Sequence, residues 1–80
     1  MEKKIAVVAI IVSDLDAVSR VNSVLHDFAE YVIGRMGLPY REKNVNVISV
    51  VVDAPQTVIN SLSGKLGMIE GVSSKVLTTK

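Results

Sequence analysis

The residues with the clearest chemical potential are 34–37, Gly-Arg-Met-Gly. Gly34 and Gly37 carry no side chain, so a ligand or another backbone can approach them closely. Arg35 offers a planar guanidinium that matches a carboxylate or a phosphate, and Met36 lies beside it. We interpret this segment as a candidate effector-binding site. The same glycines are also typical of a bulged strand at a subunit interface, and this second interpretation stays open.

A second candidate segment, residues 13–16, follows directly on an apolar run. A helix beginning here would point free N–H groups at an anionic effector, which Ser13 and Asp14 would then contact. Asp14 and Asp16 already place negative charge at this position, and a serine followed three residues later by an acid approximates a capping box. The segment is therefore either an effector contact or a simple helix cap.

His26 and Glu30 have the spacing that places two side chains on one face of a helix. Two such ligands are too few to hold a metal ion, so we expect no metal site within one chain, and we treat this pair as a weak candidate. Two pairs that met across a symmetric interface would complete a site. The chain has no cysteine, which excludes disulfides, iron–sulfur ligation and thiolate zinc sites.

The sequence contains no recognisable catalytic arrangement. Its single histidine has no nucleophile and acid at a telling spacing, and no phosphate-binding glycine loop is present. We therefore expect no catalytic residues and no enzymatic activity, and the residues identify no cofactor. Nine Lys and Arg are scattered along a chain of net charge +1, so we expect no direct binding to nucleic acid.

No apolar run approaches the roughly 18 residues of a membrane span. The first apolar run follows a short basic start, as in a signal peptide, but acidic residues come next and no cleavage site of small residues is present. We expect a cytoplasmic protein with no membrane partner.

Two apolar strands form the centre of the structure that positions these candidates. Residues 5–12 are apolar at every position, and residues 45–52 are interrupted only by Asn46 and Ser49. Because successive strand residues point to opposite faces, both strands need cover on both faces. Eighty residues with two helices can cover one face, so we expect a second copy of the chain to cover the other.

The remaining elements follow from periodicity and turn residues. Apolar spacings of three and four predict one helix from residue 13 to 29 and another from Pro55 to Gly67. Residues 31–39 predict a bent or bulged strand, residues 41–44 a turn, and residues 72–77 a last strand. This order predicts a single α+β domain over residues 1–80, a ferredoxin-like βαββαβ sandwich whose four-stranded antiparallel sheet carries both helices on one face.

Residues 31–42, Tyr-Val-Ile-Gly-Arg-Met-Gly-Leu-Pro-Tyr-Arg-Glu, resemble the small ACT-like proteins known as iron-only hydrogenase system regulators. The similarity covers almost the full chain. The other segments that share it are 10–12, 21–22, 25–26, 47–49, 51–53, 63–67 and 71–72.

This resemblance implies an ACT-type fold similar to the effector-binding half of nickel-responsive repressors. It also implies a regulatory role in the iron-only hydrogenase system, including regulation of transcription. Those repressors have a ribbon-helix-helix segment ahead of this domain and a nickel site built with cysteine and histidines. Here the first expected strand begins within five residues of Met1, and His26 is the only histidine. We expect neither feature in this chain.

The expected partners are a second copy, in a homodimer or homotetramer, and a small-molecule effector of unknown identity. We expect the effector to bind at a subunit interface, where it would touch Gly34, Arg35 and the Ser13–Asp14 loop of two subunits. A separate DNA-binding or hydrogenase-maturation protein would complete the regulatory system. The alternative interpretation is a protein–protein interaction module with no small-molecule ligand.

Overall fold

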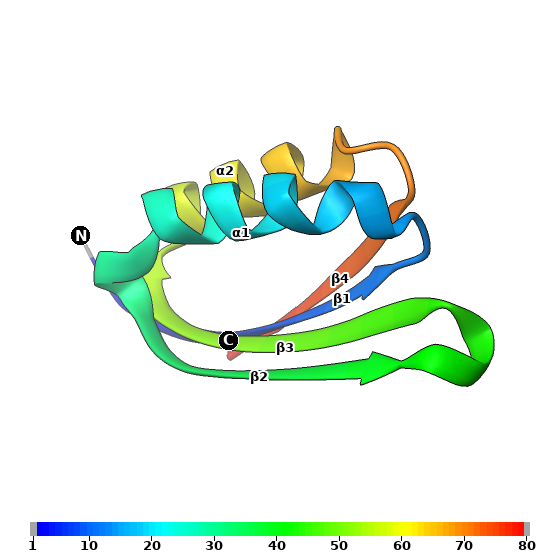
Figure 1. Ribbon diagram of the computed structural model, residues 1–80. Coiled ribbons are helices and arrows are strands. Elements are labelled where there is room, and N and C mark those ends of the chain that lie inside the picture. Colours follow the sequence, from blue (N-terminus) through cyan, green and yellow to red (C-terminus); the bar gives the residue numbers. More distant parts are fainter. Residues whose placement is uncertain (1, 80) are drawn as a thin grey trace.

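The computed structural model describes residues 2–79 as a four-stranded antiparallel sheet with two helices on one face (Figure 1). The strand order β2-β3-β1-β4 and the antiparallel pairs confirm the α+β ferredoxin-like fold that the sequence predicts. In chain order the elements are β1 (Lys3–Val12), the 3-10 turn η1 (Leu15–Ala17), α1 (Val18–Asp27), the 3-10 turn η2 (Ala29–Tyr31), β2 (Val32–Tyr40), the 3-10 turn η3 (Arg41–Lys43), β3 (Val45–Pro55), α2 (Gln56–Gly67) and β4 (Val72–Thr78).

Strand β1 has apolar residues on both sides, as its sequence predicts. Its even-numbered residues from Ala6 to Val12 are fully buried beneath the helices. On the other side Ile5, Val7 and Ile11 are 41%, 37% and 48% exposed. One side of this strand is therefore covered within the chain and the other is not.

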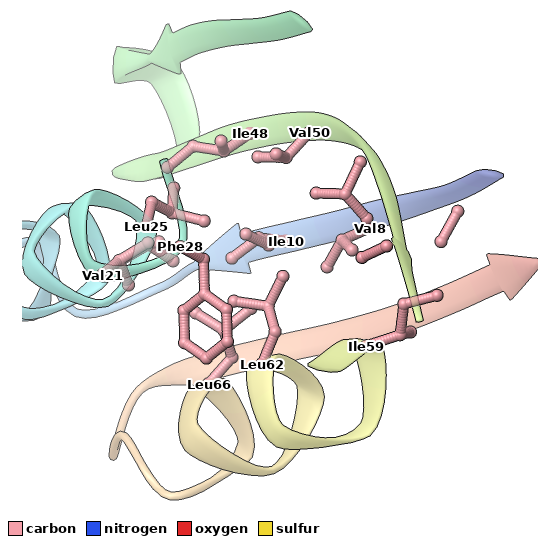
Figure 2. Close-up of a cluster of buried hydrophobic side chains, with 14 of the residues drawn as sticks. Val8, Ile10, Val21, Leu25, Phe28, Ile48, Val50, Ile59, Leu62 and Leu66 are labelled. Carbon is pink, nitrogen blue, oxygen red and sulfur yellow. The ribbon is translucent and has the colours of Figure 1, made fainter. Parts of the chain in front are cut away.

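The core lies between the sheet and the two helices (Figure 2). Side chains from the two helices and from the residues that flank α1 fill the layer above the buried residues of β1 and β3. Phe28 lies between the helices, and the ammonium of Lys65 is 5.3 Å from the centre of its ring. The buried residues of the helical layer are Ala17, Val21, Leu25, Phe28, Ile59, Leu62 and Leu66.

The first helix is shorter than predicted, because the regular α-helix begins only at Val18. Leu15 belongs to the preceding 3-10 turn and is 51% exposed, and Ala29 belongs to the 3-10 turn that follows. Both were expected in the apolar stripe. The prediction was wrong at these positions because a 3-10 turn rotates its side chains away from the α-helical stripe.

The β2–β3 hairpin differs from its prediction at both ends. Tyr31 ends a 3-10 turn instead of starting the strand, and the register of β2 shifts between Val32 and Gly34, which confirms a bulge at Ile33. The turn into β3 has Asn44 in the left-handed region with φ 53°, as expected. Strand β3 continues through Pro55, where a proline is tolerated because the strand ends there. Pro55 therefore has extended backbone and precedes α2, whereas the sequence predicted it in the first turn of that helix.

Candidate functional site

Strand β2 divides residues 34–37 between the two faces of the sheet. Arg35 and Gly37 pair with buried residues of β3, so they face the helical layer. Gly34 and Met36 alternate with them and face the other side. Within one protomer, Arg35 and Gly37 therefore lie on one side of β2, and Gly34 and Met36 lie on the other.

Arg35 is held against α1. Its Nη2 donates a hydrogen bond to Oδ1 of Asn22, which links the edge strand to the helix. A hollow of about 300 Å³ opens beside this pair, between α1 and the sheet. Its lining residues are Asn22, Leu25, His26, Ala29, Val32, Arg35 and Val50.

A second hollow, of about 210 Å³, is also lined by Asn22 and Arg35. It extends from this pair along β2 in the direction of the turn between β2 and β3. Gly37 helps to create it, because a Cβ built on this residue would meet no atom within 4 Å. We call the two hollows together the α1/β2 groove. Besides Asn22, Arg35 and Gly37, the second hollow is lined by Val18, Leu38, Pro39, Asn46 and Ile48.

The Ser13–Asp14 segment is closed by contacts within the chain. The N–H and the hydroxyl of Ser13 both donate to the carbonyl of Gly71, at 2.8 and 3.1 Å. Oδ1 of Asp14 accepts from the N–H of Asp16 at 3.0 Å, so Asp14 caps the turn, and the capping role expected of Ser13 was wrong. Gly71 has φ 82°, and a Cβ there would lie 2.4 Å from Cβ of Asp14.

The two candidate segments also lie far apart in one protomer. Arg35 pairs with Val50, which in turn pairs with Val8 of β1. Ser13 lies five residues beyond Val8 along the chain, about 17 Å in an extended strand, and two strands away from Arg35. The structure therefore does not bring Ser13 and Asp14 to the α1/β2 groove of the same chain.

His26 lines the α1/β2 groove, whereas Glu30 lies exposed in the 3-10 turn that follows α1. Among residues 2–79, no group of three His, Cys, Asp or Glu side chains is placed to hold a metal ion. The position of His26 connects it with Arg35 and not with a cluster of acids.

Among residues 2–79, no helix or strand covers the side of the sheet away from the helices (Figure 1). We call it the open face. Its centre is apolar apart from Ser49, and its charged residues lie at the margin. Its apolar members include Ile5, Val7, Ala9, Ile11, Met36, Leu38, Val47, Val51 and Leu77, and its other members include Lys3, Gly34, Ser49, Asp53, Ser73 and Lys75.

Comparison with protein families gives a match over residues 4–76 to the family described as "TM1266-like: Iron-only hydrogenase system regulator, putative". The chain belongs to this family. The resemblance noted in residues 31–42 is thereby confirmed. Comparison with curated protein sequences gives no match.

A solved structure of a TM1266-like protein has the same fold. TM1266 from Thermotoga maritima, an uncharacterized protein, is 39% identical to this chain, with a TM-score of 0.94 over 99% of this chain and 100% of its own.

Two more distant structures share the fold alone. An unknown protein from Galdieria sulphuraria is 14% identical, with a TM-score of 0.66 over 99% of this chain and 46% of its own. A formyltetrahydrofolate deformylase from Pseudomonas putida KT2440 is 18% identical, with a TM-score of 0.60 over 92% of this chain and 28% of its own. Between residues 2 and 79, no helix has the length and apolar character needed to cross a membrane.

Sequence reasoning missed Asn22 as a partner of Arg35 in this TM1266-like chain. A signal was present, because Asn22, His26 and Ala29 are spaced by four and three residues and therefore share one face of α1. That face lies beside the apolar stripe, so it borders the sheet instead of pointing into solvent. A polar residue in this border position is a candidate for contact with the neighbouring edge strand.

Proposed function

We propose that this TM1266-like chain is a non-catalytic regulatory subunit of the iron-only hydrogenase system. It self-associates through the open face and responds to a small effector in the α1/β2 groove. The observation that carries the proposal is the apolar centre of the open face, which one chain leaves in solvent. The family match supports the regulatory role and the hydrogenase system.

The size of the open face supports pairing with a second copy. Four strands at a spacing of about 4.8 Å span about 19 Å, and eight paired residues at about 3.4 Å span about 27 Å. One open face thus covers about 500 Å², and two faces in contact bury about 1,000 Å², the lower limit for a specific interface.

The distribution of charge also favours a second copy. Lys3 and Asp53 lie near one end of the open face, and Lys75 lies on its edge strand β4. The centre, around Val7 and Val47, is uncharged, which is the pattern of an interface with an apolar core and a polar rim. With charges of both signs at the margin, two copies meet without strong repulsion.

Strand β2 provides a physical connection between the groove and the interface. Arg35 faces the groove, and its neighbour Met36 faces the open side and is 67% exposed. An effector that binds one position of β2 more tightly than another therefore changes how Met36 meets the partner copy, and it shifts the assembly by that difference in affinity. An effector with equal affinity for both positions shifts nothing.

In this proposal the chain acts on transcription or hydrogenase maturation through a separate DNA-binding or maturation protein. The even distribution of nine Lys and Arg over a chain of net charge +1 supports an indirect role, since it offers no phosphate-binding footprint. A cytoplasmic location fits the same role.

The first test is native mass spectrometry of the protein purified without added ligand, which reports the subunit number and any retained mass together. We expect a dimer or tetramer, and a stoichiometric extra mass would support the sensing role. A monomer at all concentrations would refute self-association through the open face.

The open face also supports a second candidate function, a protein–protein interaction module with no small ligand. Here the apolar centre docks another protein instead of a second copy. The substitution Arg35→Ala separates the two functions. Loss of the ligand response with unchanged assembly supports sensing, whereas loss of partner binding in the absence of any ligand supports docking.

A further inference from the structure

We infer that the α1/β2 groove binds a small organic monocarboxylate with a short apolar chain. Arg35 would hold the carboxylate, and the apolar residues beside it would contact the chain. This inference deepens the sensing part of the proposed function and rests on it, because it names the chemical class of the effector.

The charge of the residues that line the groove indicates the head group of the ligand. Among the described residues, those lining the hollow beside His26 and Ala29 include one guanidinium, that of Arg35, and no Asp or Glu. A guanidinium matches a carboxylate with two parallel N–H···O bonds. Since the lining contains no lysine or second arginine, the fixed positive charge balances a monoanion better than a phosphate dianion.

Asn22 and His26 supply further hydrogen-bonding groups. Oδ1 of Asn22 already accepts from Arg35, so the amide N–H groups are the part of Asn22 left for a ligand. The same bond positions the guanidinium at the border between α1 and β2. His26, which also lines the hollow, adds an imidazole N–H donor. A carboxylate at Arg35 can thus accept from several donors at once.

The rest of the lining defines the tail of the ligand. Leu25, Ala29, Val32 and Val50 make up the remainder of the hollow, and all four are apolar. Its volume of about 300 Å³ equals the liquid volume of about ten water molecules. This space suits a ligand of a few carbons and lies at the small end of ligand sites.

The test is a titration of ¹⁵N-labelled protein with pentanoate, followed by NMR. We expect saturable shifts of the amide signals of residues 22, 26 and 35 in the millimolar range or below. Pentanamide has the same shape without the charge, and we expect it to bind at least tenfold more weakly. Equal binding of pentanoate and pentanamide, or no saturable shift with pentanoate, would overturn the inference.

Two arginine variants give a matched comparison. Arg35→Gln removes the guanidinium from the groove, and we expect it to weaken pentanoate binding at least tenfold. Arg20→Gln removes the same charge from an exposed position of α1 outside the groove, and we expect unchanged affinity. Equal losses in the two variants would show non-specific attraction of the anion and would overturn the inference.

Sedimentation of the same samples separates this inference from the proposed function. A dimer or tetramer that does not bind pentanoate would overturn the carboxylate assignment and leave self-association standing. A monomer that binds pentanoate at Arg35 would support the carboxylate assignment and refute assembly through the open face.

Discussion

The substitution Val47→Glu places a carboxylate at the centre of the open face. Val47 is 39% exposed, and it lies between Ile11 of β1 and Leu38 of β2. In the single chain the new side chain stays in solvent, so we expect the protomer to keep its fold. In a dimer built through the open face, both copies of this carboxylate would be buried without an ionic partner.

The exposed fraction of Val47 determines how much dimerisation free energy the substitution removes. Complete burial of a valine side chain contributes about 1.5 kcal/mol, so the 39% that remains exposed in one chain corresponds to about 0.6 kcal/mol. Burial of a polar group without a partner costs about 1–3 kcal/mol, and a charge costs more. We therefore expect a loss of about 2 kcal/mol per copy and about 4 kcal/mol per dimer, which is close to a thousandfold increase in Kd.

Sedimentation equilibrium over a wide range of protein concentration measures this change. Met68→Glu is the matched control, because Met68 is 86% exposed beyond the end of α2, outside the open face. We expect Met68→Glu to leave the dimer constant unchanged. If Val47→Glu also assembles like the original chain, while circular dichroism shows a folded protein, the argument from the open face is refuted.

Four further substitutions test the packing. Gly37→Val adds a side chain where no atom lies within 4 Å, and we expect a gain of about 0.5–1 kcal/mol in unfolding free energy by urea titration; a loss would contradict the open space in the groove. Gly71→Ala meets Cβ of Asp14 at 2.4 Å with φ 82°, and we expect a loss of at least about 1 kcal/mol, whereas Gly64→Ala, with no atom within 4 Å, should be stabilising by a few tenths to about 1 kcal/mol. Leu66→Ala empties a fully buried position, and thermal unfolding should show a loss of about 2–5 kcal/mol; a smaller loss would mean that the core refills the cavity.

The fold was predictable because it depends on patterns that are local in sequence. The two-sided apolar strands, the helical spacings, Asn44 in the turn and the helix end at Gly67 each identify an element without knowledge of its neighbours. The order of the elements then leaves few topologies to consider. Errors occurred where a 3-10 turn replaced a helical turn, because a 3-10 turn and an α-turn use similar residues.

The candidate site was less predictable because it joins residues that are distant in sequence. Asn22 and Arg35 are separated by 13 positions and come together only when β2 takes its place at the edge of the sheet. Ser13 appeared suited to cap the helix, but the backbone of Gly71, 58 residues away, accepts its hydroxyl instead. Local sequence patterns do not predict contacts between residues that are so far apart in the chain.

The bulge at Ile33 determines which chemistry each face of the sheet presents. Val32 pairs with Val52, and in an unbroken ladder Arg35 would pair with Ser49; the extra residue makes it pair with Val50 instead. A ladder that kept Ile33 without the bulge would exchange the faces, with the guanidinium on the interface side and Met36 in the groove. Deletion of Ile33 itself would remove the bulge and leave Arg35 opposite Val50, so the faces would stay as they are. The bulge is thus a position at which TM1266-like proteins can lose one residue and still keep the guanidinium on the groove side of β2 and Met36 on the interface side.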